Sequence, residues 1–202
     1  MQLALALKAY KGRHPLVIAI PRGAVGMARI IAHALDGEFD LVLVHKLGAP
    51  GNPELAVGAI DELGWRHISA HAGFHGATSE WLDAQAAEQL EVLRQRRARY
   101  APARKPLDAL DRVVIVVDDG IATGATMRAA LHSLRERKPA QLVCAVPVAS
   151  PEALARLRDF ADEVVCLHTP ADFDAVGRYY RHFPQVEDAE VMALLGDTSR
   201  RR

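Results

Sequence analysis

Short apolar runs alternate with longer segments of helical apolar spacing along the chain, and this alternation limits its fold more than any other feature. The runs are nearly continuous and rich in β-branched residues, as expected of strands that are covered on both faces. They predict core strands at residues 16–20, 41–45, 113–117, 142–148 and 164–167. Helices are predicted at residues 25–35, 79–100, 125–137, 151–159 and 187–195, with Ser79 as an N-cap. The alternation predicts an α/β fold with an open, mostly parallel twisted sheet flanked by helices.

Length and irregular stretches predict the domain organisation. A chain of 202 residues is expected to form one domain, residues 1–202, with a core at about residues 14–170. Residues 48–79 are rich in Gly, His and small side chains, and we expect a flexible flap there, with a hairpin around residues 62–64. Residues 168–186 are rich in Tyr, Phe, His and Arg and form a second irregular stretch.

Charge and hydropathy exclude several classes of protein. Lys and Arg total 25, as do Asp and Glu, and a net charge of zero disfavours a nucleic-acid binder that relies on a basic field. The apolar runs are far shorter than the roughly 20 residues that span a bilayer, and the N-terminus resembles an amphipathic helix rather than a signal peptide. Cys144 and Cys166 lie in apolar runs, which indicates buried thiols in a reducing compartment, so we expect a cytoplasmic protein.

The segment after the strand at residues 113–117 carries the clearest chemistry. Asp118 and Asp119 end the strand, and a loop of small and hydroxyl residues then enters a helix at residues 122–126. Backbone N–H groups at a helix N-terminus bind anions, whereas two carboxylates suit sugar hydroxyls or a metal ion. One ligand that satisfies both halves is a ribose phosphate. The alternative is a strand that ends in two solvated acids beside an ordinary helix cap.

Two other phosphate-binding motifs do not fit this loop. Gly120 and Gly124 are too close together for a Walker A motif and no Lys follows them, and the chain has no GxGxxG sequence. Instead, residues 114–126, VIVVDDGIATGAT, resemble the phosphoribosyl pyrophosphate (PRPP) signature of type I phosphoribosyltransferases. The segments PRGAVG, HKLGAPGNPELAVGAI, DEVVCLHTP, DAVGRYY and FPQVED further resemble a bacterial group of phosphoribosyltransferases whose substrate is undefined.

This resemblance implies a fold and an activity. The fold would carry a flap and a small hood, made of the N-terminal segment and residues 168–186, and would form a homodimer. The activity would be Mg²⁺-dependent transfer of a phosphoribosyl group from PRPP to a nitrogen nucleophile, usually a nucleobase, with release of pyrophosphate, in nucleotide metabolism and salvage. The cofactor would be magnesium, and the ligands would be PRPP and a small nitrogenous acceptor.

The resemblance also implies the roles of individual residues. Asp118 and Asp119 would hold the ribose hydroxyls, directly or through Mg²⁺ and water, as the catalytic and metal-binding pair. The ribose phosphate would be cradled by Ala122, Thr123, Gly124, Ala125 and Thr126. Pyrophosphate would be bound by the loop Arg22, Gly23 and Ala24, and its charge neutralised by Lys46 at the end of the second predicted strand. The alternatives are a turn with a surface Arg and a solvated Lys.

Two departures from the family pattern bear on the acceptor. Gly120 stands where the family usually has an apolar residue, so we expect a more flexible loop. Ala122 stands where 6-oxopurine enzymes commonly have an Asp, which disfavours hypoxanthine–guanine activity. Tyr179 to His182 would stack on the base or form a satellite core.

A second hypothesis is a non-catalytic regulator that senses PRPP or nucleotides and binds RNA or a protein. A cluster of basic residues, for which a solvated helix face is the favoured interpretation, motivates it: Arg94, Arg96, Arg97, Arg99, Arg104 and Lys105. His67, His71 and His75 recur every four residues, but glycines interrupt the stretch, so we expect loop histidines rather than a zinc site.

Overall fold

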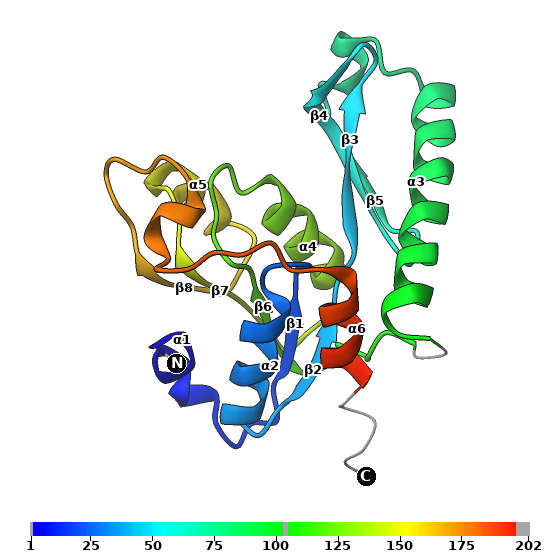
Figure 1. Ribbon diagram of the computed structural model, residues 1–202. Helices are drawn as coiled ribbons and strands as arrows, with labels where there is room; N and C mark the ends of the chain where they lie inside the picture. The colour runs from blue at the N-terminus through cyan, green and yellow to red at the C-terminus, as the bar shows by residue number, and fades with distance from the viewer. Residues whose placement is uncertain (1, 103–104, 197–202) are drawn as a thin grey trace.

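The computed structural model describes residues 2–102 and 105–196, and its centre is a parallel sheet (Figure 1). Its strands are β1 (Leu16–Ala19), β2 (Glu38–Leu41), β6 (Val113–Val117), β7 (Gln141–Val148) and β8 (Glu163–His168). They lie in the order β2-β1-β6-β7-β8, and all four pairings are parallel. The predicted open parallel sheet is confirmed.

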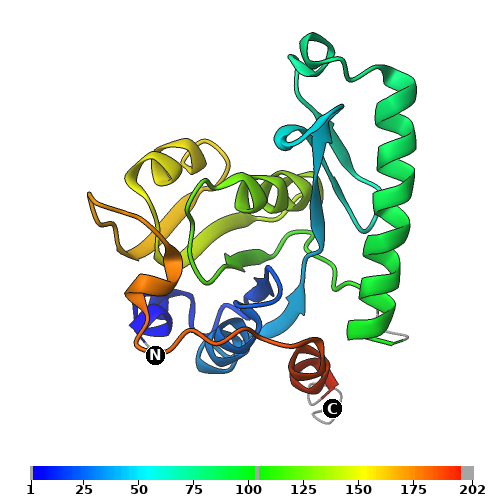
Figure 2. The same cartoon turned by 45° about the horizontal axis from the view of Figure 1, so that its top comes forward.

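Helices cover both faces of this sheet, which explains why its strands are apolar throughout. Alternate residues of each strand point to opposite faces, so Val17 and Ile115 join one core and Leu16 and Val114 the other. The first core is covered by α1 (Gln2–Ala6), α2 (Val25–Ala34) and α6 (Asp188–Gly196). The second is covered by α4 (Ala125–Glu136) and α5 (Pro151–Leu157). Figure 2 shows these helices on either side of the sheet.

A second sheet projects from the first. It is antiparallel, in the order β3-β4-β5, and consists of β3 (Val44–Ala49), β4 (Asn52–Asp61) and β5 (Arg66–Ile68). The turn η2 (Ala72–His75) and the long helix α3 (Ser79–Tyr100) follow and lie alongside it (Figure 1). The predicted flap is therefore a folded sheet with its own small core around Val57, Ala77 and Leu82. The predicted hairpin at residues 62–64 is confirmed.

The predicted core strand at residues 41–45 is wrong. The main-sheet strand ends at Leu41, and β3 begins at Val44 in the other sheet. Val42 and Leu43 join the two strands and are fully buried, so apolarity runs through a segment where the chain changes sheets. The Leu43 N–H donates to Oε1 of Glu62, which starts the turn of the hairpin, and the Glu62 N–H donates to the Leu43 carbonyl.

A buried arginine fastens the second sheet and α3 to the main sheet. Arg97 donates to both carboxylate oxygens of Glu62, to Asp40 at 2.8 Å and to the Leu41 carbonyl at 2.7 Å. Both acids are less than 5% exposed. Because neither partner can reach water, this ion triad fixes the hairpin turn against β2. Arg97 belongs to the basic cluster for which a solvated face was expected, and that expectation is wrong for this residue.

Smaller corrections concern helix ends, the thiols and the N-terminus. Thr78, not Ser79, caps α3, since its hydroxyl accepts from the Trp81 N–H at 3.3 Å. Cys144 is buried but Cys166 is half-buried. In the N-terminal segment, the hydroxyl of Tyr10 donates to Glu163, at the amino end of β8. Over the described residues, no helix is long and apolar enough to cross a membrane.

Candidate active site

Two adjacent carboxylates stand where β6 leaves the sheet. Asp118 and Asp119 directly follow Val117, and the Asp119 N–H donates to Oδ1 of Asp118 at 2.9 Å. Burial, and then the charge of Asp119, raises the pKa of Asp118 well above its ordinary value. Burial also raises the pKa of Asp119. Within the described ranges, neither carboxylate forms an ion pair with a Lys, Arg or His. The pair therefore holds negative charge that a ligand can compensate.

The loop after β1 packs directly against this pair. A Cβ added at Gly23 would stand 1.8 Å from Oδ2 of Asp119, far inside van der Waals contact. The Pro21–Arg22 peptide bond in this loop is cis. The structure thus brings the loop of residues 21–24 and the acidic pair together, at the carboxyl ends of the paired strands β1 and β6.

The small-residue loop leads from the acidic pair into α4. Gly124 is its N-cap with φ of 78°, a left-handed conformation that favours glycine. Ala122 and Thr123 are exposed, while Ala125 and Thr126 open the helix. Ser150, the N-cap of α5, donates its hydroxyl to the Ala122 carbonyl at 2.8 Å. The loop is therefore held by a neighbouring helix start, and its exposed residues lie at the N-terminus of α4, the end of a helix that attracts anions.

A hood lies over the acidic pair. Its helical turn is η3 (Val176–Tyr179), and a Cβ at Gly120 would stand 2.5 Å from Cγ1 of Val176. Gly120 is therefore packed under the hood, and the expected flexibility of the loop at this residue is not supported. The hydroxyl of Tyr180 donates to the Asp119 carbonyl. Burial, and then the charge of Asp119, raises the pKa of this hydroxyl, so it stays a donor.

The aromatic residues of the hood also contact one another, in the satellite core considered above. Phe173 stacks on Tyr179 with ring centroids 5.7 Å apart, and Tyr180 meets Phe183 at 4.9 Å.

Arg22 is held by a residue that sequence reasoning missed. Its Nη1 lies 3.6 Å from Oδ1 of Asp188, the first residue of α6. The same carboxylate accepts from the Tyr100 hydroxyl at 2.7 Å and pairs with Arg99 at 3.2 Å. The hydrogen bond from Tyr100 lowers the pKa of Asp188. Asp188, near the other end of the chain, thus orients the half-exposed guanidinium of Arg22. In the sequence, only its place in the segment FPQVED could have indicated this role.

Lys46 does not end a strand of the main sheet, as predicted. It lies within β3, opposite Ala59 of β4, and lines a cavity between the second sheet and α4. That cavity reaches Ala125 but is lined by neither Arg22 nor the acidic pair. The structure therefore separates Lys46 from the loop with which the sequence grouped it.

The remaining candidates have mainly structural contacts. Among residues 2–102 and 105–196, no group of three His, Cys, Asp or Glu side chains could hold a metal ion. His71 contacts Phe74, with ring centroids 6.1 Å apart. Arg99 pairs with Asp188 while its side chain stays largely exposed, so the burial of Arg97 is what interrupts the solvated face of the basic cluster. Arg104, the fifth member of that cluster, lies outside the described residues.

Known proteins share both the sequence and the fold. Residues 3–181 match the family model of the phosphoribosyl transferase domain. Two proteins from separate strains of Mycobacterium tuberculosis, each named "putative phosphoribosyl transferase", are 42% identical to the chain over 196 residues, or 96% of its length. The chain spans only 44% of the length of these relatives. The crystal structure of TT1426 from Thermus thermophilus is 46% identical, with a TM-score of 0.88 over 97% of this chain and 93% of that one.

Proposed function

Because the chain belongs to the phosphoribosyl transferase domain family, we propose that it transfers a phosphoribosyl group from PRPP to a nitrogen nucleophile, with Mg²⁺ bound and pyrophosphate released. The observation that carries this proposal is the close packing of three elements at one edge of the sheet. The loop of residues 21–24 touches Asp119, and the acidic pair runs directly into the amide-lined start of α4. One sugar phosphate spans all three.

Each end of the sugar has its own partners. The amides of residues 123–126 and the positive end of α4 bind the ribose phosphate, which carries negative charge. The carboxylates of Asp118 and Asp119 accept hydrogen bonds from the two ribose hydroxyls. When the bond to the leaving group breaks, positive charge develops on the sugar, and the nearby carboxylates stabilise it electrostatically. Tyr180 and Ser150 position this machinery by holding the carbonyls of Asp119 and Ala122.

The residues present fit a magnesium ion that arrives with the substrate. Mg²⁺ prefers oxygen ligands and binds through one or two carboxylates together with substrate phosphates. The acidic pair supplies such oxygens and lacks a cationic partner within the described ranges, while no third acidic or His side chain completes a protein-only site there. Bound at Asp118 and Asp119, the ion would neutralise phosphate charge. Arg22, aimed by Asp188, would bind the departing pyrophosphate as a forked donor.

The acceptor is proposed to be a planar nitrogen base that enters under the hood. Tyr180 lies beside the acidic pair there and Tyr179 precedes it in the hood, and aromatic rings stack well on bases. Ala122 is exposed and has no proton to exchange, so a 6-oxopurine is the least favoured acceptor. A regulator that only senses PRPP would use the same contacts without turnover. Its RNA-binding form loses support because Arg97 is buried.

Pyrophosphate release tests this function directly. The protein is incubated with PRPP and Mg²⁺, with and without each of a panel of nucleobases, and calorimetry measures PRPP binding in parallel. We expect PRPP binding that requires Mg²⁺, and turnover with at least one base. Asp119→Asn should abolish both, whereas Asp159→Asn, at an exposed acid in the turn after α5, should change neither. Binding without turnover would favour the regulator, and absence of PRPP binding would refute both.

A further inference from the structure

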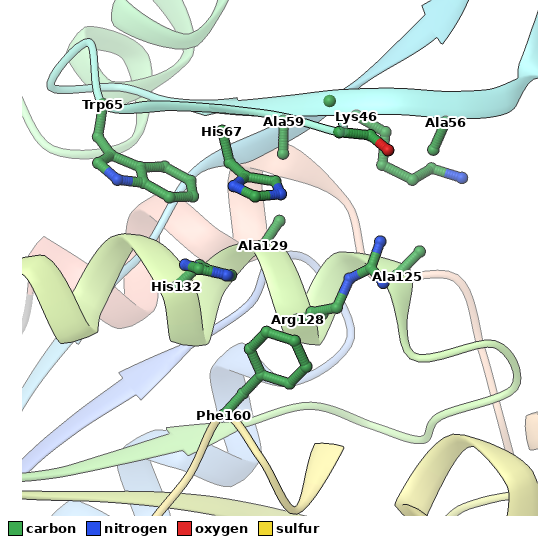
Figure 3. A pocket seen from close by; sticks show the side chains of 12 residues that line it. Lys46, Ala56, Ala59, Trp65, His67, Ala125, Arg128, Ala129, His132 and Phe160 are labelled. Atoms are coloured by element: carbon green, nitrogen blue, oxygen red, sulfur yellow. The ribbon is translucent and has the colours of Figure 1, made fainter. Parts of the chain in front are cut away.

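The cavity that contains Lys46 lies between the second sheet and α4 and measures about 140 Å³ (Figure 3). It exists because small residues face each other across it, Ala56, Gly58 and Ala59 from β4 and Ala125 and Ala129 from α4. A cavity of about 150 Å³ holds a benzene ring. The space is therefore large enough for one planar ring.

Four ring side chains line the cavity, two from each of its sides. Trp65 and His67 come from the second sheet, His132 from α4 and Phe160 from the segment after α5 (Figure 3). The rings of His67 and His132 stack with centroids 4.7 Å apart, and Trp65 stacks on His132 at 5.6 Å. Phe160 lies 5.1 Å from His132. Flat rings stacked across two separate elements offer a surface on which another planar ring can stack.

Cations stand at the other end. Lys46 and Arg128 lie near Ala56 and Ala125, away from Trp65 (Figure 3). Among the side chains that the structure describes, no carboxylate lines the cavity, and no acid lies within ion-pair distance of either cation. Burial, His67 and Arg128 all lower the pKa of His132, against a weaker opposing effect of Glu136 on the same helix, so His132 is neutral at pH 7. Lys46 and Arg128 are therefore the cations at this end of the cavity, and no acid among the described side chains neutralises them.

We infer that this cavity is a second ligand site, which binds a planar aromatic anion with its ring against His67 and His132 and its phosphate or carboxylate between Lys46 and Arg128. The site is distinct from the proposed PRPP site, since only Ala125 is common to both. A ligand in this cavity therefore leaves the acidic pair open to PRPP.

The test uses fluorescence of Trp65, which lines the cavity. The chain has two Trp residues, so Trp81→Phe leaves Trp65 as the only emitter of this kind. Phenyl phosphate is titrated as the probe, with inorganic phosphate and phenol as halves of the same molecule. We expect saturable quenching by phenyl phosphate and binding at least tenfold weaker for each half. Equal binding of inorganic phosphate would overturn the inference in favour of a simple anion site.

Variants locate the probe and separate this inference from the proposed function. Arg128→Gln should weaken phenyl phosphate binding about tenfold or more. Arg135→Gln, on the same helix but paired with Asp162 outside the cavity, should not. Ala129→Leu should block binding by filling the space. Asp119→Asn should abolish PRPP binding yet leave phenyl phosphate binding intact. The inference fails if quenching does not saturate, or if it survives both Arg128→Gln and Ala129→Leu.

Discussion

Replacing Gly23 by alanine tests whether the loop after β1 and the acidic pair work as one unit. The new methyl carbon would lie 1.8 Å from Oδ2 of Asp119, and ordinary contact begins at 3.4 Å, so Oδ2 must retreat by about 1.6 Å. The atoms in the way are all side-chain atoms of Asp119, so its carboxylate rotates away while the backbone stays. A displacement of this size breaks a hydrogen bond to a ribose hydroxyl.

The loss can be estimated from that hydrogen bond. One hydrogen bond to a charged group contributes about 1.5–3 kcal/mol, which corresponds to a PRPP dissociation constant roughly 10- to 100-fold higher. Calorimetry with Mg²⁺ present measures it. Fold stability should stay within about 1 kcal/mol of the wild type, since alanine restricts the unfolded chain. Gly26→Ala is the matched control, because its Cβ would meet only Leu194, at 3.9 Å, and PRPP binding should not change.

A double-mutant cycle shows whether the effect passes through Asp119. If it does, Asp119→Ala should cost far less PRPP affinity in the Gly23→Ala background than in the wild type. The reasoning is refuted if Gly23→Ala binds PRPP within twofold of the wild type, or if the two substitutions are additive.

Three further substitutions probe charge and burial. Asp118→Asn should abolish PRPP binding while leaving the protein at least as stable at pH 7 in urea unfolding, because a carboxyl whose pKa is raised on folding destabilises the folded state once ionised. Arg97→Met should lower the free energy of unfolding by about 3–5 kcal/mol, since Glu62 and Asp40 would remain buried without a partner, and an unchanged urea midpoint would contradict this. Because folding lowers the pKa of His132, its contribution to the free energy of unfolding is complete above pH 6.5 and is lost as the pH falls further. The urea midpoint should therefore drop between pH 7.5 and 5.5, and it should drop less in His132→Asn.

The parts of the fold and site that could be predicted are those written in contiguous sequence. The strand at residues 113–117, the acidic pair and the loop into α4 follow one another within 14 residues, so their order alone places them together. The strands β1 and β7 could be predicted equally well, because a strand that is buried on both faces requires an unbroken apolar run. The family assignment is confirmed for the same reason, since its signature is local.

What could not be predicted depends on contacts between distant residues. The apolar residues 41–45 indicate a buried segment, but they do not indicate to which sheet it belongs. The sequence therefore predicts one strand where the structure has the end of β2 and the start of β3, and it places Lys46 at the wrong sheet. Arg97 resembles its basic neighbours, and only the packing of Asp40 and Glu62 around it makes it internal. Gly120 faces Val176, which is far from it in the sequence. No local sequence pattern therefore shows that a residue without a side chain is needed here to make room for the hood.

Ser150 links the phosphate loop to a different helix, and this has a consequence for protein engineering. Its hydroxyl both caps α5 and donates to the carbonyl of Ala122, so the shape of residues 120–124 is inherited in part from a turn 28 positions further along. Grafting the thirteen-residue signature onto another α/β scaffold would transfer its residues without the hydrogen bond from Ser150 that holds the loop. A working transplant would have to carry the serine and the first turn of its helix as well.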